Sequence, residues 1–209
     1  NGCSPVLVNM IPSYCGGTLP YLFSTVGSFL PNLPSGTVET GYRFYIKNLT
    51  TGEERELERP IRTFNLTMTD IYEYSTTYEV RAAVRVNAEW QPYGAVCLMT
   101  TPSIPTTQVV STTCGTTLPL IGSTIGCNTV NSANLYRFRV VNAANALETQ
   151  TIERTLNNFK LTQLTQYPVQ YNTIYNVSVQ VRVIIDGNEV WSNYGSVCTV
   201  ATPTFPTTQ

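Results

Sequence analysis

The chain contains one pattern of residues twice, and this repetition limits what it can fold into. A Tyr-x-Phe-x-Ile/Val pattern begins at Tyr42 and again at Tyr136, 94 residues later (136 − 42). The next matched segments begin at Phe64 and Phe159, 95 residues apart (159 − 64), so the register slips by one residue. A repeat of about 100 residues has the usual size of a domain. The sequence therefore predicts two domains of one fold, at residues 1–102 and 103–209.

The segment from Cys97 to Pro119, called here the junction segment, closes one repeat and opens the next. Its first half returns at Cys198 to Gln209, and its second half resembles Cys15 to Pro20. Its prolines restrict the backbone, so we expect this segment to set the stiffness between the domains. Because residues 204–209 copy its beginning, we expect them to start the linker to a further repeat.

The composition indicates packed domains with a neutral surface. Hydrophobic residues make up 42% of the chain and charged residues 12%, against about 25% charged in typical soluble domains. A net charge of −1 gives no electrostatic basis for binding nucleic acid. No apolar run approaches the roughly 20 residues of a spanning helix. We therefore expect neither a nucleic-acid partner nor membrane insertion.

Alternating residues predict β-strands throughout. The longest such segments are Tyr78 to Val86 and Tyr175 to Val183. In the second repeat the strand leads to Asp186-Gly187, a pair typical of two-residue hairpin turns. No helical periodicity extends over three turns, and clusters of Gly, Pro, Asn and Thr separate the short strands. The sequence therefore predicts an all-β fold of two sandwiches with about seven strands each.

The order of these motifs resembles that of fibronectin type III domains over nearly all of both repeats. Tyr-x-Phe-x-Ile/Val is followed by Phe-x-Leu-Thr, Thr-x-Tyr-x-Val-x-x-x-Val, Gly-x-Val-Cys and a closing Thr-Pro. The core tryptophan usual in the second strand is missing from both repeats. The resemblance implies immunoglobulin-like sandwiches. Sandwich folds place a tyrosine corner at Tyr78 and Tyr175, whose hydroxyls would tie each strand to the loop before it.

A closer resemblance is to the repeats of large surface proteins of Bacteroidetes. It rests on Cys-Gly-x-Thr-Leu at one end of each repeat and Tyr-Gly-x-Val-Cys with Thr-Pro at the other. In that family such repeats accompany type IX secretion, adhesion and gliding motility, mainly as spacers or binding units. The resemblance implies an extracellular, cell-surface location. Its implied partners are neighbouring repeats of the same polypeptide, with surface polysaccharide or another cell-surface protein as further candidates.

The six cysteines indicate disulfides rather than a metal or redox centre. The chain has no histidine and no Cys-x-x-Cys pair, and persistent disulfides form in oxidising compartments. No signal peptide is visible at the N-terminus, so secretion is inferred from the cysteines alone. Six cysteines allow fifteen pairings, and the sequence selects none of them.

A sandwich of the kind implied by the resemblance makes two pairings plausible, because its first and last strands can lie side by side in parallel. These pairings are Cys15 with Cys97, and Cys114 with Cys198. Cys3 and Cys127 have no counterparts in the repeat and could bridge the two domains. The preferred interpretation is that Cys127 is a buried free thiol and that Cys3 is incompletely paired.

The sequence offers little for catalysis. Without histidine, the Ser-His-Asp and Cys-His arrangements are excluded. The acidic run from Glu53 to Arg59 has mixed charges and is interpreted as a solvated strand rather than an acid/base site. No calcium-binding loop motif is present. We therefore expect a protein that is not an enzyme, with no metal and no cofactor.

Two aromatic pairs are candidates for ligand or inter-domain contact: Trp90 with Tyr93, and Trp191 with Tyr194. Exposed rings can stack on a sugar or anchor a protein ligand. We favour packing in the core or between domains, with Trp191 and Tyr194 beneath the junction segment.

An outward row of arginines is a second candidate, for anionic ligands such as carboxylates or acidic glycans. Cross-strand pairing with Glu79 or the Glu58 region is the favoured alternative. The Asn-x-Ser/Thr sequences at Asn48, Asn65 and Asn176 are interpreted as coincidental. The arginines of the row are Arg43, Arg81 and Arg85 in the first repeat, and Arg137, Arg139 and Arg182 in the second.

Together these features predict a non-catalytic segment of a secreted, multi-repeat bacterial surface protein. It would act as an adhesin stalk or spacer with weak surface or glycan contacts. One alternative is a pair of carbohydrate-binding modules attached to a secreted enzyme, which loss of glycan binding in Trp90→Ala or Trp191→Ala would support. The other is a self-assembling extracellular fibre subunit, which would use the exposed low-charge edge strands.

Overall fold

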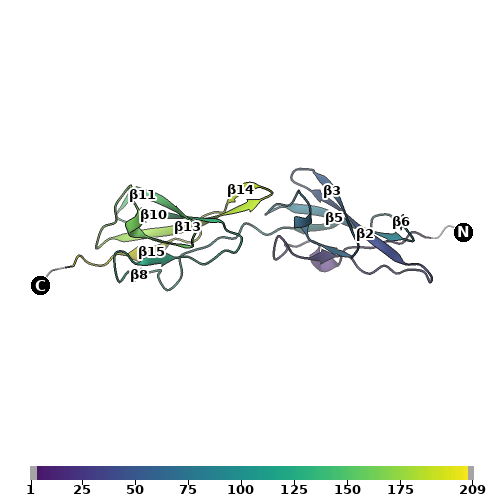
Figure 1. Cartoon of the computed structure of the whole chain (residues 1–209), viewed down its shortest axis with the longest axis horizontal. Helices are drawn as coiled ribbons and strands as arrows, with labels where there is room; N and C mark the ends of the chain where they lie inside the picture. The colour runs from purple at the N-terminus through teal and green to yellow at the C-terminus, as the bar shows by residue number, and fades with distance from the viewer. Residues whose placement is uncertain (1–3, 207–209) are drawn as a thin grey trace. The chain divides into compact units, whose positions relative to one another are not determined.

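The computed structural model describes residues 4–206 and divides the chain into two compact units, Asn1–Ser103 and Ile104–Gln209. The division lies one residue from the predicted domain boundary. Unit 1 contains η1 (Pro12–Tyr14), β1 (Val26–Gly27), β2 (Glu39–Asn48), β3 (Glu54–Arg59), β4 (Thr63–Phe64), η2 (Leu66–Met68), β5 (Thr77–Val86), β6 (Glu89–Trp90) and β7 (Cys97–Thr100) (Figure 1). Unit 2 contains β8 (Thr116–Thr117), β9 (Thr124–Gly126), β10 (Leu135–Asn142), β11 (Asn145–Arg154), β12 (Asn158–Lys160), η3 (Leu161–Gln163), β13 (Ile174–Ile185), β14 (Asn188–Trp191) and β15 (Cys198–Ala201).

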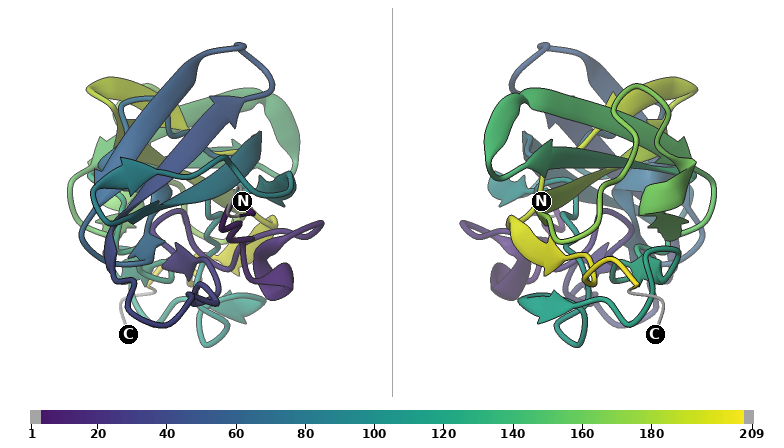
Figure 2. Two further views of the ribbon diagram at one scale, coloured as in Figure 1. Left: turned by 90° about the vertical axis from the view of Figure 1, so that its right-hand side faces the viewer. Right: turned by 90° about the vertical axis from the view of Figure 1, so that its left-hand side faces the viewer.

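Unit 1 is a sandwich of two antiparallel sheets. The larger sheet has the order β3-β2-β5, with β6 and β7 both paired to β5. The β2–β3 hairpin of this sheet is the blue ribbon of Figure 2. The smaller sheet pairs β1 with β4, and the bridge between Met10 and Ser28 adds the segment around Met10 to it. This segment, residues 8–11, precedes β1 and is called the first strand here, as is its counterpart at residues 107–110 of unit 2. Phe44 and Phe64 come from opposite sheets, and their ring centroids lie 4.4 Å apart in the core.

Unit 2 repeats this arrangement. Its larger sheet has the order β11-β10-β13-β15-β8, with β14 also paired to β13. Its smaller sheet pairs β9 with β12, and a bridge from Val109 to Cys127 adds the first strand. The Phe138 and Phe159 rings meet in the core at 4.5 Å. In the larger sheets, β3 pairs with β2 in unit 1 and β11 pairs with β10 in unit 2. The predicted all-β fold with two sandwiches is confirmed.

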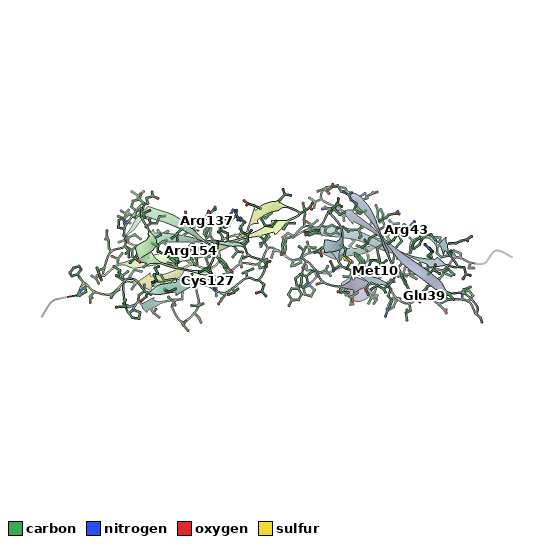
Figure 3. The ribbon with its side chains drawn as sticks, viewed as in Figure 1. Met10, Glu39, Arg43, Cys127, Arg137 and Arg154 are labelled. Carbon is green, nitrogen blue, oxygen red and sulfur yellow. A yellow bond between two sulfur atoms is a disulfide. The ribbon has the colours of Figure 1, made fainter. Side chains whose placement is uncertain are left out.

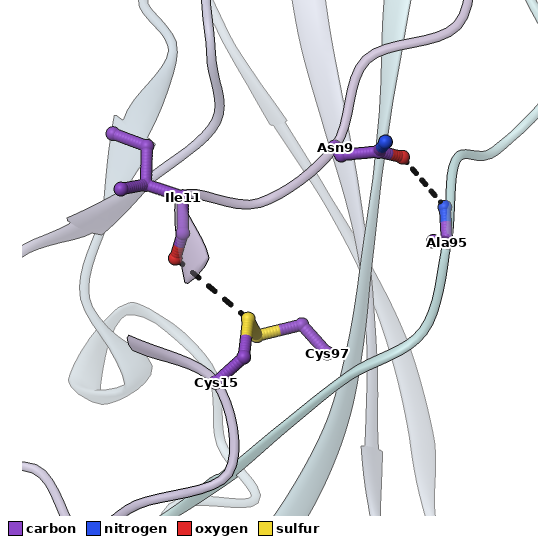
Figure 4. Close-up of a disulfide and its surroundings, with 5 residues drawn as sticks. All are labelled: Asn9, Ile11, Cys15, Ala95 and Cys97. Carbon is purple, nitrogen blue, oxygen red and sulfur yellow. Dashed lines mark hydrogen bonds between the residues drawn. A yellow bond between two sulfur atoms is a disulfide. The ribbon is translucent and has the colours of Figure 1, made fainter. Parts of the chain in front are cut away.

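A disulfide ties the start of each sandwich to its end. Cys15 bonds to Cys97 with their Cα atoms 5.0 Å apart, and Cys114 bonds to Cys198 with 5.2 Å between the Cα atoms. Figure 4 shows the first bridge. Beside each bridge the early strand runs parallel to the last strand: Thr18 bridges to Thr100, and β8 pairs with β15. The structure therefore contains both pairings that the resemblance made plausible.

The tyrosine corners are present, with a difference between the units. The Tyr78 hydroxyl donates to the carbonyl of Ile71 at 2.7 Å and accepts from the N–H of Glu73 at 2.7 Å. Burial is the main cause that raises the pKa of Tyr78 above its usual value. The Tyr175 hydroxyl accepts from the N–H of Gln170 at 2.9 Å. Both strands are therefore tied to the preceding loop, as predicted.

Tight turns close the last hairpin of each unit. Val86 pairs with Glu89 around Asn87 and Ala88, which have φ of +47° and +67°. Ile185 pairs with Asn188 around Asp186 (φ +49°) and Gly187 (φ +78°), so the predicted hairpin is confirmed. Two residues with positive φ match the right-handed twist of the strands. Ala88 adopts this conformation at a cost that glycine avoids.

A glycine lets the first strand approach the last part of each sandwich. A Cβ atom at Gly94 would lie 2.9 Å from the carbonyl carbon of Val8, and closer still to its oxygen. Gly195 has the same relation to the backbone of Thr107. Next to Gly94, the N–H of Ala95 donates to Oδ1 of Asn9 at 2.8 Å (Figure 4). The Gly-x-Val-Cys motif thus includes a position where a side chain does not fit.

Candidate functional site: the arginine and aromatic face

A tryptophan lies on the outer face of the larger sheet in unit 1. Trp90 is directly opposite Arg85 of the neighbouring strand β5. The guanidinium carbon of Arg43, labelled in Figure 3, lies 4.2 Å from the centroid of the Trp90 ring, and that of Arg85 lies 5.8 Å away. A cation near an aromatic face is attracted by the ring quadrupole, by about 0.5–1 kcal/mol at exposed sites. Two arginines therefore hold Trp90 on the sheet.

Unit 2 has the same arginine–tryptophan contact, although its hairpin is longer than that of unit 1. Trp191 is directly opposite Arg182 of β13. The Arg137 guanidinium carbon lies 3.9 Å from the centroid of the Trp191 ring, and that of Arg182 lies 5.9 Å away. Arg139 lies over Tyr194 at 4.2 Å. The arginine and aromatic face is thus a repeated feature of the chain.

Tyr93 occupies the face differently from Tyr194. Its hydroxyl donates to Oε1 of Glu56 at 2.8 Å, and its ring centroid lies 6.0 Å from that of Tyr45. Burial, followed by the hydrogen bond to Glu56, raises the pKa of Tyr93. Tyr93 is therefore anchored to the edge strand β3 rather than to an arginine.

Carboxylates neutralise most of the arginines in the row. Arg43 pairs with Glu58 at 2.8 Å and Arg81 with Glu79 at 3.0 Å. In unit 2, Arg137 donates from Nε to Glu153 at 2.8 Å. Arg182 pairs with Glu189 at 3.0 Å. The favoured cross-strand pairing is present for Arg43 and Glu58, which are opposite each other on β2 and β3, whereas Arg81 and Glu79 lie two residues apart on the same strand, β5. Binding of anionic ligands by this face stays a prediction.

Within each unit, the arginines and the aromatic residues named from the sequence contact each other. The four aromatic rings are half-buried and lie outside both hydrophobic cores, so packing in the core is excluded, while packing between domains stays a prediction. The reason is that arginines on neighbouring strands of the same face supply the contacts that a core would otherwise provide. The rings are Trp90, Tyr93, Trp191 and Tyr194.

Arg85 differs from its counterpart in unit 2. Its Nε donates to Oγ1 of Thr40 at 3.1 Å, but no carboxylate among residues 4–206 lies within 4.0 Å of it. A hollow of about 260 Å³ adjoins Arg85, Trp90 and Gly41. In unit 2 Leu135 stands at the position of Gly41, and Glu189 neutralises Arg182. In the described part of the chain, Arg85 and Arg139 are thus the arginines of the row without a carboxylate within 4.0 Å.

The sequence analysis missed a second aromatic group, at the loop before β1. The rings of Tyr21 and Phe23 stack with centroids 5.3 Å apart and planes 11° apart. They are 61% and 64% exposed and border a hollow of about 360 Å³ together with Tyr14. Unlike the pairs predicted from the sequence, these rings occur in one repeat only. The sequence feature that could have indicated this group is the difference between the repeats at this loop, where unit 2 has Leu120 and Gly122.

Of the two cysteines without a counterpart in the repeat, the structure describes Cys127. Cys127 is a free thiol, 2% exposed, and burial raises its pKa to about 11. Cys3 lies outside the described residues. Of the possible glycosylation sequences, Asn48 is 1% exposed, and its Oδ1 accepts from the N–H groups of Thr50 and Thr51. Asn48 is therefore part of a turn and closed to modification in the folded unit.

Between residues 4 and 206, no three side chains of His, Cys, Asp or Glu gather where they could hold a metal ion. Within the same span, no helix has the length and apolar character needed to cross a membrane.

Comparisons with known proteins identify structural neighbours. No protein-family model matches the chain. No curated protein matches it either. Among solved structures, it is similar to the FN1–FN3 domains of chicken CNTN1, with 15% identity over 97% of this chain and 65% of that one (TM-score 0.36). It is also similar to the chicken interferon gamma receptor alpha chain, with 12% identity over 87% of this chain and 93% of that one (TM-score 0.39). A bacterial neighbour is the pair of fibronectin(III)-like modules of CbhA from Clostridium thermocellum, with 10% identity over 94% of each chain (TM-score 0.32).

Both units have the strand order of fibronectin type III-like sandwiches. This assignment rests on two features: the start of each unit contributes to both of its sheets, and β3 and β11 belong to the larger sheets.

Proposed function

We propose that the chain is a non-catalytic, load-bearing segment of a secreted multi-repeat surface protein, acting as an adhesin stalk or spacer. The observation that carries this proposal is the position of the two disulfides. In each unit the bridge joins the first part of the sandwich to its last strand, which are the segments through which tension enters and leaves a domain within an array.

The bridges would shield most of each unit from tension. Cys15 and Cys97 are 82 residues apart in a unit of 103 residues, so 103 − 82 = 21 residues lie outside the closed loop. In unit 2 the separation is 84 of 106 residues (209 − 103), which leaves 22. The strands between the cysteines would remain within a covalent loop even if their sheets came apart.

The same bonds support the proposed extracellular location. Disulfides persist in oxidising compartments, which supports an extracellular protein. The Cys-Gly-x-Thr-Leu and Tyr-Gly-x-Val-Cys motifs support the narrower proposal of a Bacteroidetes surface protein exported by type IX secretion, with a role in adhesion or gliding motility. Antibody labelling of intact cells of the source organism tests the location, and labelling only after cell lysis would contradict it.

The charge of the edge strand argues against the fibre alternative through unit 1. β3 is an edge of its sheet and carries Glu54, Arg55, Glu56, Glu58 and Arg59. Charged edge strands oppose pairing between sheets of different molecules. We therefore favour a stalk in which units are joined along the polypeptide.

Single-molecule stretching of the two-unit chain tests the load-bearing role. A fully extended chain spans roughly 3.5 Å per residue, so unfolding an oxidised unit exposes a contour of roughly 70 Å, and a reduced unit roughly 360 Å, before subtracting the folded length. A Cys15→Ser/Cys97→Ser variant should give one long and one short step without reductant. Long steps from both units in the oxidised wild type would show that the bridges do not carry the load.

A further inference from the structure

The loop from Pro20 to Thr25 of unit 1 has an exposed aromatic surface. Tyr21 and Phe23 stack on each other, and with Tyr14 they border the hollow of about 360 Å³. The other residues that line this hollow are Leu19, Pro20, Ser24 and Thr25. None of the lining residues carries a charge. The hollow therefore suits an uncharged ligand with an apolar face.

Unit 2 shows that the rings are not needed to form the loop. Its equivalent residues, 99 positions later, are Thr113 for Tyr14, Leu120 for Tyr21 and Gly122 for Phe23. The local hydrogen bonds are nevertheless the same. The Tyr21 N–H donates to Ser24 Oγ at 3.0 Å, and the Leu120 N–H donates to Ser123 Oγ at 3.1 Å.

The backbone bond that closes the turn is also conserved between the units. The Ser24 N–H donates to the carbonyl of Tyr21 at 3.1 Å, and the Ser123 N–H donates to that of Leu120 at 3.0 Å. A loop that keeps its geometry with leucine and glycine does not require two aromatic side chains. The exposed rings of unit 1 are therefore not explained by the stability of the loop, and binding of a ligand would explain them.

The size of the surface limits what could cover it. An aromatic side chain buries roughly 150–250 Å² when fully covered, so two rings about three-fifths exposed offer roughly 200–300 Å². A stable protein interface needs about 800 Å² from each partner. The surface is too small for a protein, whereas one sugar ring can stack on an aromatic face. The hollow is also close to the lower end of the range of small-ligand sites, about 300–1,000 Å³.

We propose that Tyr21 and Phe23 form a binding site for an uncharged sugar ring of a polysaccharide. The C–H groups on one face of the sugar ring would stack on the aromatic rings, and its hydroxyl groups would remain at the open, polar rim near Ser24 and Thr25. A single such site is weak, and copies in a multi-repeat protein would gain through effective concentration. The inference adds a ligand to the proposed stalk and does not require that the stalk bears load.

Electrophoresis of the full two-unit chain through gels that contain polysaccharide tests the proposal. The probes are the uncharged β-1,4-glucan, β-1,3-glucan and α-mannan, with polygalacturonate as the charged comparison. We expect retardation by at least one uncharged polymer. The double substitution Tyr21→Leu/Phe23→Gly, which installs the residues of unit 2, should weaken that retardation at least tenfold.

A graft into unit 2 supplies the matched control. A Cβ atom at Gly122 meets nothing within 4 Å, so a side chain is tolerated there. Leu120→Tyr/Gly122→Phe should strengthen retardation severalfold by adding a second site. Unchanged thermal unfolding of both variants would show that the fold is intact. The proposal is overturned by the absence of retardation on every uncharged polymer, by preferential retardation on polygalacturonate, or by retardation that survives the double substitution.

Discussion

Gly94→Ala should destabilise unit 1 by about 3 kcal/mol. The added methyl carbon would lie 2.9 Å from the Val8 carbonyl carbon and 2.5 Å from Oδ1 of Asn9. Both contacts are with the first strand, which must move away to relieve them. Overpacking of this kind costs about 1–3 kcal/mol. Loss of the Asn9–Ala95 hydrogen bond, 2.8 Å long, adds about 1 kcal/mol.

Urea unfolding measures this change, because the free energy of unfolding falls linearly with urea concentration. A Trp191→Phe background leaves Trp90 as the sole tryptophan, so that fluorescence reports on unit 1. Gly17→Ala is the matched control, since a Cβ atom there meets nothing within 4 Å. This control should be neutral or stabilising by less than about 1 kcal/mol. If the two variants differ by less than 1 kcal/mol, the close approach of the first strand is not what requires glycine.

Three further predictions are checked by urea unfolding, with Trp90 reporting on unit 1 and, in a Trp90→Phe background, Trp191 reporting on unit 2. Ala88→Gly should stabilise unit 1 by about 1 kcal/mol, because Ala88 has φ of +67°, and a lower urea midpoint would contradict this. Tyr78→Phe should cost about 1–3 kcal/mol and more than Tyr175→Phe, because the Tyr78 hydroxyl makes two hydrogen bonds; equal costs would count against this reasoning. The folded Cys127 thiol keeps its proton up to a pKa of about 11, so unit 2 should lose stability from about pH 8.5, the pKa of an unfolded thiol, up to pH 11. Cys127→Ala should remove that part of the pH dependence, and an unchanged profile would exclude the thiol as its source.

The position of a two-residue turn determines which residues of a hairpin lie opposite each other, so part of the site could be predicted from the sequence. A two-residue turn at positions 87 and 88 pairs residues whose numbers add to 175, and 85 + 90 = 175 pairs Arg85 with Trp90. A turn at 186 and 187 gives 373, and 182 + 191 = 373 pairs Arg182 with Trp191. The second turn was predicted, so its cation–π pair could have been predicted too.

Other parts of the site depend on contacts between distant residues. The approach of Val8 to Gly94 and the bond from Tyr93 to Glu56 depend on strands far apart in the sequence. No local pattern encodes these distances. The exposure of Tyr21 and Phe23 could not be predicted either. The three residues from Tyr21 to Phe23 form one apolar run in the sequence, although only Leu22, which is 7% exposed, is buried. The repeated alternation, in contrast, encodes which face of each strand is buried, and so the sandwiches were predictable.

The spacing of the cysteines also has a consequence for how the protein is made. In an unfolded chain, Cys97 is 17 residues from Cys114 but 82 from its native partner Cys15. Loop-closure entropy then favours the wrong pair by about 1.5RT ln(82/17), or about 1.4 kcal/mol, roughly tenfold in rate or population. Oxidation before folding would therefore link neighbouring repeats to each other. Correct pairing requires that each sandwich folds while its thiols are still reduced, so an array of this kind must collapse repeat by repeat before it meets an oxidant.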